Sequence, residues 1–232
     1  MSRRRPIIAI DGPVGAGKSV AARALARALG FSYLNTGAMY RAVAIAAREA
    51  GVSPEDADVE ARLAPVLAAI KIKFDGESIF LNRRDVTAIV SEPEVGELAS
   101  RFSAIASVRA RMRELQRAAG ADGGVVMEGR DIGTAIFPDA EFKFFLVADV
   151  KTRARRRFEE LKKKGASIAE HEVFEQLIER DRRDSGRELA PLKRADDATE
   201  IDSTKLSIDA VVAAMKAKIN ARINAAKDLK RA

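Results

Sequence analysis

The pattern of apolar and polar residues predicts strands that alternate with helices along most of the chain. Short apolar runs, typical of buried strands, lie at residues 7–10, 31–34, 125–127, 141–147 and 199–201. Stretches with helical composition or spacing lie at residues 20–29, 38–50, 53–69, 94–119, 150–164, 169–184 and 207–226. This alternation predicts an α/β fold in which helices cover both faces of a parallel sheet.

A different pattern interrupts the alternation of strands and helices. Apolar and charged residues alternate over residues 70–74, which is typical of a strand with one buried face. The Asp-Gly pair at 75–76 favours a two-residue hairpin turn, with Ile72 opposite Ile79. A third strand is expected at residues 86–89. We therefore expect a small antiparallel insert within the α/β chain.

Composition narrows the class of protein. With 232 residues, 47% of them hydrophobic, the chain is long enough for a sizeable core, and we expect a single domain over residues 1–232. The absence of cysteine excludes disulfides, thiolate metal sites and cysteine nucleophiles. The first apolar run is too short for a signal peptide, and no apolar stretch is long enough to span a membrane. We expect a cytoplasmic monomer with no membrane association.

The net charge of +7 favours an anionic partner. Basic runs at residues 153–157 and 162–164 allow the hypothesis of a nucleic-acid-binding protein. Aromatic residues make up only 5% of the chain and tryptophan is absent, so platforms for base stacking are scarce. We therefore expect small anionic substrates and no obligatory nucleic acid.

The residues after the first apolar run match the phosphate-loop pattern in full. These are Gly12, Pro13, Val14, Gly15, Ala16, Gly17, Lys18 and Ser19. They lie between a predicted strand and a predicted helix, where backbone N–H groups and the helix N-terminus attract an oxyanion. Lys18 is expected to contact the β- and γ-phosphates of a nucleotide, and the Ser19 hydroxyl to bind Mg²⁺.

Further charged clusters follow predicted strands or lie in charged helices. Thr36 with Arg41, and Arg130 with Asp131, come after strands whose carboxyl ends share the edge of the phosphate loop. Basic residues over 150–187 flank a loop, which is the arrangement of a lid. No strong general base is present, and phosphoryl transfer to an ionised phosphate needs none. Glu128 is open to two interpretations: it orients metal-bound water, or it caps a turn.

Five stretches together resemble the bacterial cytidylate kinase family, in order and spacing. They are DGPVGAGKS at 11–19, NTGAMYR at 35–41, EGRDIGT with FPDA at 128–140, RDRRDSGR at 180–187, and APL, DD and IDST within 190–204. The likeness covers residues 6–212. It implies a P-loop kinase core with a nucleotide-monophosphate-binding insert at residues 62–100 and a lid at residues 150–187. It also implies an enzyme that uses Mg²⁺ to transfer the γ-phosphoryl group of ATP to CMP or dCMP.

The same resemblance implies roles for individual residues. ATP is expected to contact the phosphate loop and the lid arginines Arg153, Arg156 and Arg157. Residues expected to contact CMP are Thr36, Arg41 and Arg130 at its phosphate, Ser100, Arg109 and Asp131 at cytosine, and Arg180 and Asp184 at the sugar. Lys18, Arg130 and Arg187 are the expected catalytic cations. Because unpaired arginines repel one another, we expect the arginines at 153, 156, 157 and 187 to become ordered only when phosphates bind.

Some features depart from the family pattern or leave alternatives open. Asn35 stands where the family usually has aspartate, and Val20 follows Ser19 where many relatives have threonine. A different small-molecule P-loop kinase is the main alternative, and a GTPase is disfavoured because the guanine motif Asn-Lys-x-Asp is absent. Asp131 has a structural alternative, in which it pairs with Arg130 or caps the following turn.

Overall fold

The computed structural model describes residues 5–228 and divides into two compact units. Unit 1 contains the chain up to Tyr33, then residues 122–186 and the chain from Ala190 onward. Unit 2 contains residues 34–121 and 187–189. The phosphate-loop pattern therefore falls in unit 1, and the predicted antiparallel insert in unit 2.

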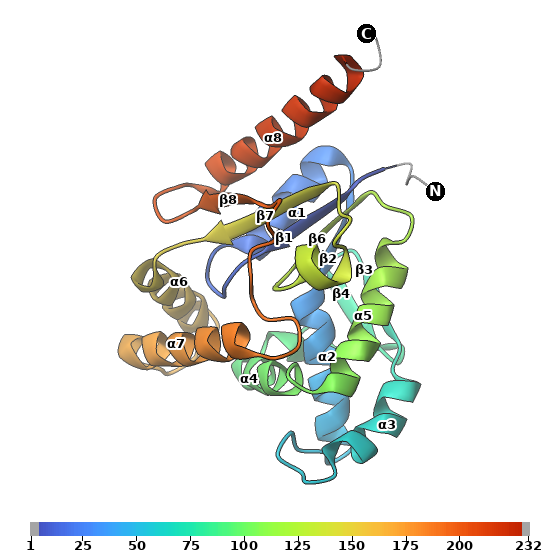
Figure 1. Cartoon of the computed structure of the whole chain (residues 1–232). Coiled ribbons are helices and arrows are strands. Elements are labelled where there is room, and N and C mark those ends of the chain that lie inside the picture. Colours follow the sequence, from blue (N-terminus) through green and yellow to red (C-terminus); the bar gives the residue numbers. More distant parts are fainter. Residues whose placement is uncertain (1–4, 229–232) are drawn as a thin grey trace. The chain divides into compact units, whose positions relative to one another are not determined.

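Unit 1 is built on a five-stranded sheet in the order β2-β6-β1-β7-β8 (Figure 1). Its strands are β1 (Ile7–Asp11), β2 (Ser32–Asn35, which runs into unit 2), β6 (Val125–Gly129), β7 (Phe142–Val147) and β8 (Thr199–Asp202). Its helices are α1 (Lys18–Leu29), α6 (Val150–Lys163), α7 (Glu170–Gly186) and α8 (Ile208–Asp228), with a short π-helical turn at Ile132–Ile136. The pairs β1–β6, β1–β7 and β7–β8 are parallel, which confirms the predicted α/β class.

One face of this sheet is covered by α1 and α8. Apolar side chains of both helices, such as Leu25 and Met215, pack with Ile8 and Phe144 of the sheet, and all four are almost fully buried. Burial of this kind is the main stabilising contribution to the unit. The packing fixes the start of α1, and with it the phosphate loop, against the carboxyl end of β1.

Unit 2 combines helices with a three-stranded antiparallel sheet in the order β3-β4-β5. Its helices are α2 (Thr36–Glu49), α3 (Val59–Ala69), α4 (Pro93–Phe102) and α5 (Ala106–Gly120), with a 3₁₀ turn at Ile89–Ser91. Its strands are β3 (Ile72–Asp75), β4 (Ser78–Leu81) and β5 (Arg84–Asp85). This sheet confirms the predicted antiparallel insert.

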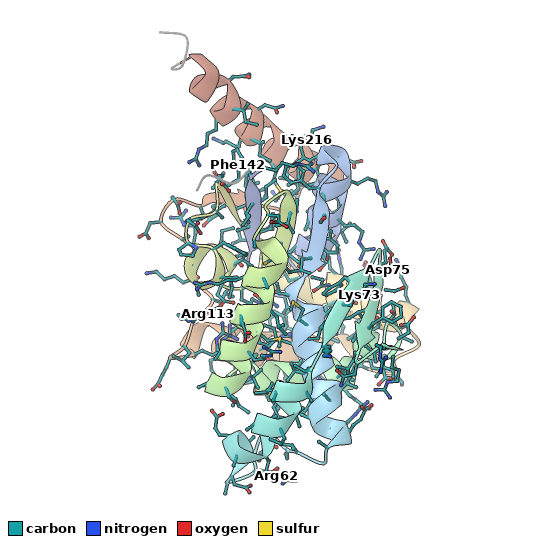
Figure 2. All side chains as sticks on the ribbon, turned by 90° about the vertical axis from the view of Figure 1, so that its right-hand side faces the viewer. Arg62, Lys73, Asp75, Arg113, Phe142 and Lys216 are labelled. Atoms are coloured by element: carbon teal, nitrogen blue, oxygen red, sulfur yellow. The ribbon has the colours of Figure 1, made fainter. Side chains whose placement is uncertain are left out.

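The register of the hairpin differs from the sequence prediction. Ile72 pairs with Leu81 and Phe74 with Ile79, so the predicted pairing of Ile72 with Ile79 is wrong by two residues. Asp75 still belongs to the strand, and Gly76, at φ 57°, begins the loop. A shift of two residues keeps every side chain on its predicted face, because the strand period is two. Lys73 and Asp75 accordingly lie on the exposed face of the hairpin (Figure 2).

Two further element boundaries differ from the prediction. The third strand is β5, at Arg84–Asp85, and residues 86–89 form no strand. The helix predicted over residues 94–119 is two helices, because the chain is extended at Ile105. Ser103 lies in this break, where its Oγ donates to the Ser100 carbonyl at 2.7 Å. The break leaves the Ser103 carbonyl, which a continuous helix would have used internally, to accept a hydrogen bond from Arg109 at 3.2 Å.

The predicted insert at residues 62–100 lies within unit 2, and α6 and α7 of the predicted lid lie within unit 1. Assignment of the two segments as a functional insert and lid stays a prediction. Among the residues that the structure describes, no helix is long and apolar enough to cross a membrane.

Candidate active site

The phosphate loop connects β1 to α1, and backbone atoms of other segments lie so close to two of its glycines that a side chain would not fit there. A Cβ atom at Gly12, which has φ 146°, would lie 2.1 Å from the carbonyl oxygen of Leu146. One at Gly15 would lie 2.8 Å from the carbonyl oxygen of Arg153. Gly17, at φ 91°, precedes the first residue of α1. Only glycine permits both these close approaches and these positive φ angles.

Lys18 is buried, with 5% of its surface exposed, and its Nζ donates to the Pro13 carbonyl at 2.6 Å. Burial, and after it the nearby positive charge of Arg130, lower the pKa of Lys18 to about 7. The charges of Glu128, Asp11 and Asp184 act in the opposite direction. Phosphate groups placed beside Lys18 would favour its charged form and raise its pKa.

We therefore expect ATP binding to take up about half a proton near pH 7, because Lys18 is partly neutral before ATP binds and charged afterwards. Calorimetric titration with ATP in buffers of different ionisation enthalpy measures this uptake. Lys18→Met is the control, since any uptake that remains belongs to other groups. Equal uptake by both proteins would contradict the assignment of the titrating group to Lys18.

A hydroxyl network connects the phosphate loop to the end of β6. The Tyr33 hydroxyl donates to Glu128 Oε1 at 2.7 Å and also hydrogen-bonds to the hydroxyl of Ser19. Burial raises the pKa of Tyr33, and the negative charge of Glu128 acts in the same direction. Glu128 is itself buried. A hydroxyl and a carboxylate in one network are the oxygen donors that suit a hydrated Mg²⁺ ion.

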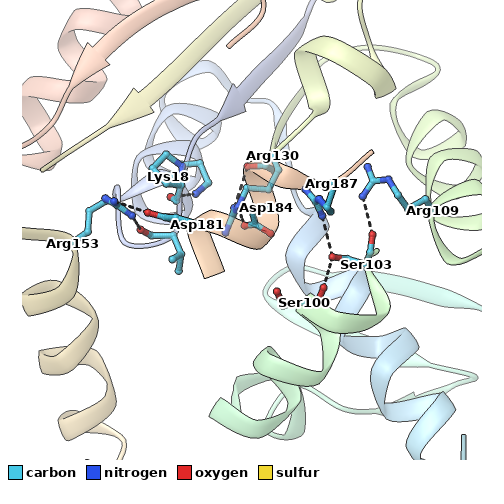
Figure 3. A network of polar contacts seen from close by, with 12 residues as sticks. Lys18, Ser100, Ser103, Arg109, Arg130, Arg153, Asp181, Asp184 and Arg187 are labelled. Atoms are coloured by element: carbon cyan, nitrogen blue, oxygen red, sulfur yellow. Dashed lines mark hydrogen bonds and ion pairs between the residues drawn. The ribbon is translucent and has the colours of Figure 1, made fainter. Parts of the chain in front are cut away.

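The residues that follow β6 lie in the same unit as the phosphate loop. Arg130 Nε donates to Asp184 Oδ2 on α7 at 2.9 Å, which joins two motifs that are 54 residues apart (Figure 3). Asp131 is buried, and its side chain forms no capping bond to the turn that follows it. Instead, the N–H groups of Ile132 and Gly133 donate to the carboxylate of Asp11. The alternative in which Asp131 caps this turn is therefore wrong.

The lid arginines have protein partners, which corrects the expectation that they are unpaired without phosphate. Arg153 bridges to Asp181 at 2.7 Å and donates to the Val14 carbonyl of the phosphate loop at 3.1 Å (Figure 3). Arg156 Nη2 donates to the carbonyl of Ser203 at 2.7 Å. Ser203 Oγ in turn donates to the Ala16 carbonyl at 2.9 Å. Carbonyl and carboxylate acceptors offset the repulsion between these cations. The same hydrogen bonds connect the phosphate loop to α6 and to Ser203, the residue that follows β8.

Arg157 and Arg180 complete the predicted set on α6 and α7. Arg157 pairs with Glu160 of its own helix at 2.8 Å. Arg180 is half-buried on α7, one turn before Asp184. Residues one turn apart share a helix face.

In unit 2, Ser103 accepts hydrogen bonds from two arginines at the break between α4 and α5. Arg109 Nη1 donates to the Ser103 carbonyl at 3.2 Å, and Arg187 Nη1 donates to Ser103 Oγ at 3.0 Å (Figure 3). The Arg109 guanidinium also lies 5.9 Å from the centre of the Tyr40 ring. The buried Ser100 Oγ has no hydrogen-bond partner among the described residues. A buried hydroxyl without a partner fits a group that awaits a polar ligand.

The first two turns of α2 hold Thr36, which is 3% exposed, and the half-buried Arg41. Asn35 caps this helix, because its Oδ1 accepts the Ala38 N–H at 3.0 Å. A neutral amide is thus sufficient for the capping role at this position. Gly96 of α4 leaves room for the Arg41 guanidinium, whose Nε lies 3.7 Å from where a Cβ would stand.

Comparison with known proteins assigns the family. The model of the family described as cytidylate kinase matches residues 8–221. A cytidylate kinase from Citrifermentans bemidjiense is 47% identical over 221 residues, which cover 94% of each chain. One from Carboxydothermus hydrogenoformans is 49% identical over 210 residues, covering 89% of this chain and 93% of that protein. The chain belongs to the cytidylate kinase family.

Family membership confirms the resemblance predicted from the sequence motifs. The residues expected to contact CMP fall in both units. Unit 1 contains Arg130, Asp131, Arg180 and Asp184, and unit 2 contains Thr36, Arg41, Ser100 and Arg109. Their roles at the substrate stay predictions.

Sequence reasoning missed several polar residues of these networks. Asp11, Tyr33, Ser103 and Ser203 belong to no contiguous phosphate-binding pattern, yet each joins segments that are far apart in the chain. Asp11 and Ser203 fall within the quoted stretches DGPVGAGKS and IDST, and each ends or follows a predicted strand. A polar residue at the carboxyl end of a parallel strand was the available signal.

Proposed function

We propose that this member of the cytidylate kinase family transfers the γ-phosphoryl group of ATP to CMP, or to dCMP, and forms ADP and the matching diphosphate. The observation that supports this most is the grouping of Lys18 with Arg130 and Asp184 in one electrostatic network. The phosphate-loop lysine thereby lies near the motif that the family resemblance assigns to the acceptor. Phosphoryl transfer between two phosphates requires cations beside the donor phosphate and cations beside the acceptor phosphate, close to one another.

On the donor side, we assign the phosphates of ATP to the phosphate loop and Lys18. Arg153 and Arg156 are fixed beside this loop through Val14 and Ser203, which supports their assignment to ATP. Arg157 is assigned with them from the same helix. Positive charge held in place before the reaction stabilises the transition state without reorganisation cost.

Mg²⁺ fits the oxygen donors near the phosphate loop. We assign it to the Ser19 hydroxyl, with Glu128 orienting water molecules of its shell, because both side chains hydrogen-bond to Tyr33. When bound, the ion would offset the charge of the β- and γ-phosphates. The described residues contain no group of three or more acidic or histidine side chains that could hold a metal.

On the acceptor side, we assign the phosphate of CMP to Thr36, Arg41 and Arg130. Cytosine is assigned to Ser100, Arg109 and Asp131, and the sugar to Arg180 and Asp184. The Ser100 hydroxyl, to which no described residue hydrogen-bonds, and the buried Asp131 support the cytosine assignment. Arg187 is assigned to the phosphate in transfer. An ionised CMP oxygen attacks the γ-phosphorus in line, the bond to the β-phosphate oxygen breaks, and ADP leaves with those electrons.

A panel of nucleoside monophosphates, assayed for ADP release with ATP and Mg²⁺, tests this proposal. We expect CMP and dCMP to be phosphorylated with much higher kcat/KM than UMP, AMP or GMP. Inorganic phosphate and a non-nucleotide alcohol acceptor serve as controls for ATP hydrolysis and for a different kinase. Activity with another acceptor and none with CMP or dCMP would refute the proposal.

A further inference from the structure

Asp11 ends β1 and has no substrate role in the assignments above. It is 5% exposed, so its carboxylate is withdrawn from water. Oδ1 accepts the N–H of Ile132 at 2.9 Å, and Oδ2 accepts the N–H of Gly133 at 2.7 Å. Burying a carboxylate costs free energy unless such bonds compensate, and a neutral residue would end the strand at lower cost. The two bonds therefore indicate that Asp11 acts on the segment that follows β6.

The same residue fixes both ends of a two-residue segment. The backbone of Asp11 pairs in register with Gly129, the last residue of β6. Its side chain holds Ile132 and Gly133, three and four residues further along. Arg130 and Asp131 are the only residues between these anchors. The backbone of Asp131, at φ −143° and ψ 23°, follows neither a regular strand nor a helix, so the anchors decide its orientation.

Close contact at Gly133 makes this arrangement specific. A Cβ atom there would lie 3.4 Å from Asp11 Oδ2 and 3.1 Å from Lys143 Cδ. Lys143 has little freedom to move away, because its Nζ donates to the Pro138 carbonyl at 2.5 Å and to Asp197 at 2.9 Å. The segment therefore reaches Asp11 without displacing its neighbours only because residue 133 has no side chain.

We propose that Asp11 is a positioning residue that sets the selectivity for cytosine by fixing the backbone on both sides of Arg130 and Asp131. This inference rests on the proposed function, since it assumes that Asp131 contacts the base. A hydrogen bond to a base edge depends on direction, so a looser Asp131 loses discrimination between bases. The charge of Asp11 also acts on Lys18, but any effect on ATP is the same whichever acceptor is present, so it cancels in the CMP-to-UMP ratio.

The protonation of Asp11 supplies an independent measurement. The pKa of Asp11 is raised to about 7, mainly by burial and to a smaller extent by the negative charge of Asp131. The hydrogen bonds from Gly133 and Ile132 and the positive charge of Lys18 act in the opposite direction. Lys143, from β7, is the further charged side chain beside Gly133. A protonated carboxyl presents a hydroxyl donor toward one of the two N–H groups, so one bond is lost.

The test compares Asp11→Asn with Glu141→Gln in the full chain. Glu141 is the matched control, because its Oε2 accepts the N–H of Ile7 at 2.8 Å, at the opposite end of β1. For Asp11→Asn we expect the CMP-to-UMP ratio of kcat/KM to fall by about tenfold or more, the effect of losing one hydrogen bond to a charged group. The KM for CMP should rise, and it should rise more than the KM for UMP. Glu141→Gln should leave the ratio unchanged.

A pH series completes the comparison. The wild-type ratio should fall from pH 8 to pH 6, whereas the ratio of Asp11→Asn should stay flat, because this variant has no carboxyl group at position 11. Titration of the acceptor phosphate and of Lys18 acts on both substrates alike and cancels in the ratio. A merely structural role would lower both activities together and would give no such pH dependence.

Gly133→Ala displaces the segment while leaving the Asp11 carboxylate in place, and it keeps the test valid if Asp11→Asn fails to fold. We expect the CMP-to-UMP ratio to fall in this variant as well. An unchanged ratio in whichever of the two variants is folded, as judged by thermal unfolding, would overturn the positioning role. Wild-type protein that does not phosphorylate CMP would instead refute the proposed function, so the two failures are distinguishable.

Discussion

Lys18→Ala is expected to lower kcat by about a hundredfold or more, the scale of losing one preorganised charge in a buried site. Lys18 is buried beside Arg130, Glu128 and Asp184, so no other cation can move into its position without opening this network. Steady-state kinetics with CMP and ATP measure the loss. Lys216→Ala, on the exposed surface of α8, removes a lysine without touching the site and should leave kcat unchanged.

Loss of folding would not explain such a result. Because burial lowers the pKa of Lys18 from 10.5 to about 7, the folded state binds fewer protons than the unfolded state between these values. Lys18 therefore weakens folding at pH 7 and below, and this penalty disappears as the pH rises. Lys18→Ala should unfold at a temperature no lower than that of the wild type at pH 6. A normal kcat in this variant would refute the phosphate-loop assignment.

Asp131→Ala is expected to narrow the CMP-to-UMP ratio of kcat/KM, by up to about four orders of magnitude, the range over which sites with buried polar groups reject an unmatched partner. A carboxylate accepts from the amino group of cytosine but opposes the carbonyl oxygen of uracil at the same position. The buried Asp131 side chain does not cap the turn that follows it, because the first two N–H groups of that turn donate to Asp11 instead. Activity with CMP should collapse while activity with UMP changes little.

Asp122→Ala is the control for Asp131→Ala. Asp122 is exposed and lies just before β6, the strand that Asp131 follows. It should leave both substrates unaffected. If Asp131 only pairs with Arg130, its removal should lower both activities together and reduce thermal stability. An unchanged ratio in a folded Asp131→Ala protein would exclude Asp131 as the residue that selects cytosine.

Several conclusions followed from the sequence alone because their physical causes are local. The phosphate loop is contiguous, so its glycines, Lys18 and Ser19 can be recognised as a phosphate-binding pattern within a few residues. The apolar runs predicted the sheet of unit 1, and the alternation at residues 70–74 predicted the antiparallel hairpin of unit 2. The combination of motifs predicted the family, which the family match confirms. The roles of the predicted site residues stay predictions.

Other features were decided only by the tertiary structure, because they depend on partners that are far apart in the chain. The hairpin register depends on which loop geometry Gly76 adopts, and a period of two leaves both registers equally apolar. The pairing of Arg153 with Asp181, rather than with phosphate alone, depends on how α6 packs against α7. Spacing along the sequence holds no information about such contacts.

Asp11 shows the difference most clearly. Its sequence context predicts only a polar residue that ends a strand before the phosphate loop. The parallel pairing of β1 with β6 brings it beside a turn that begins 121 residues later, and burial then makes the carboxylate depend on the two N–H groups of that turn. Sequence determined which chemical groups the chain has at each strand end. The sheet decided which of them meet, because hydrogen bonds act over about 3 Å and strand order is set by the packing of the whole unit.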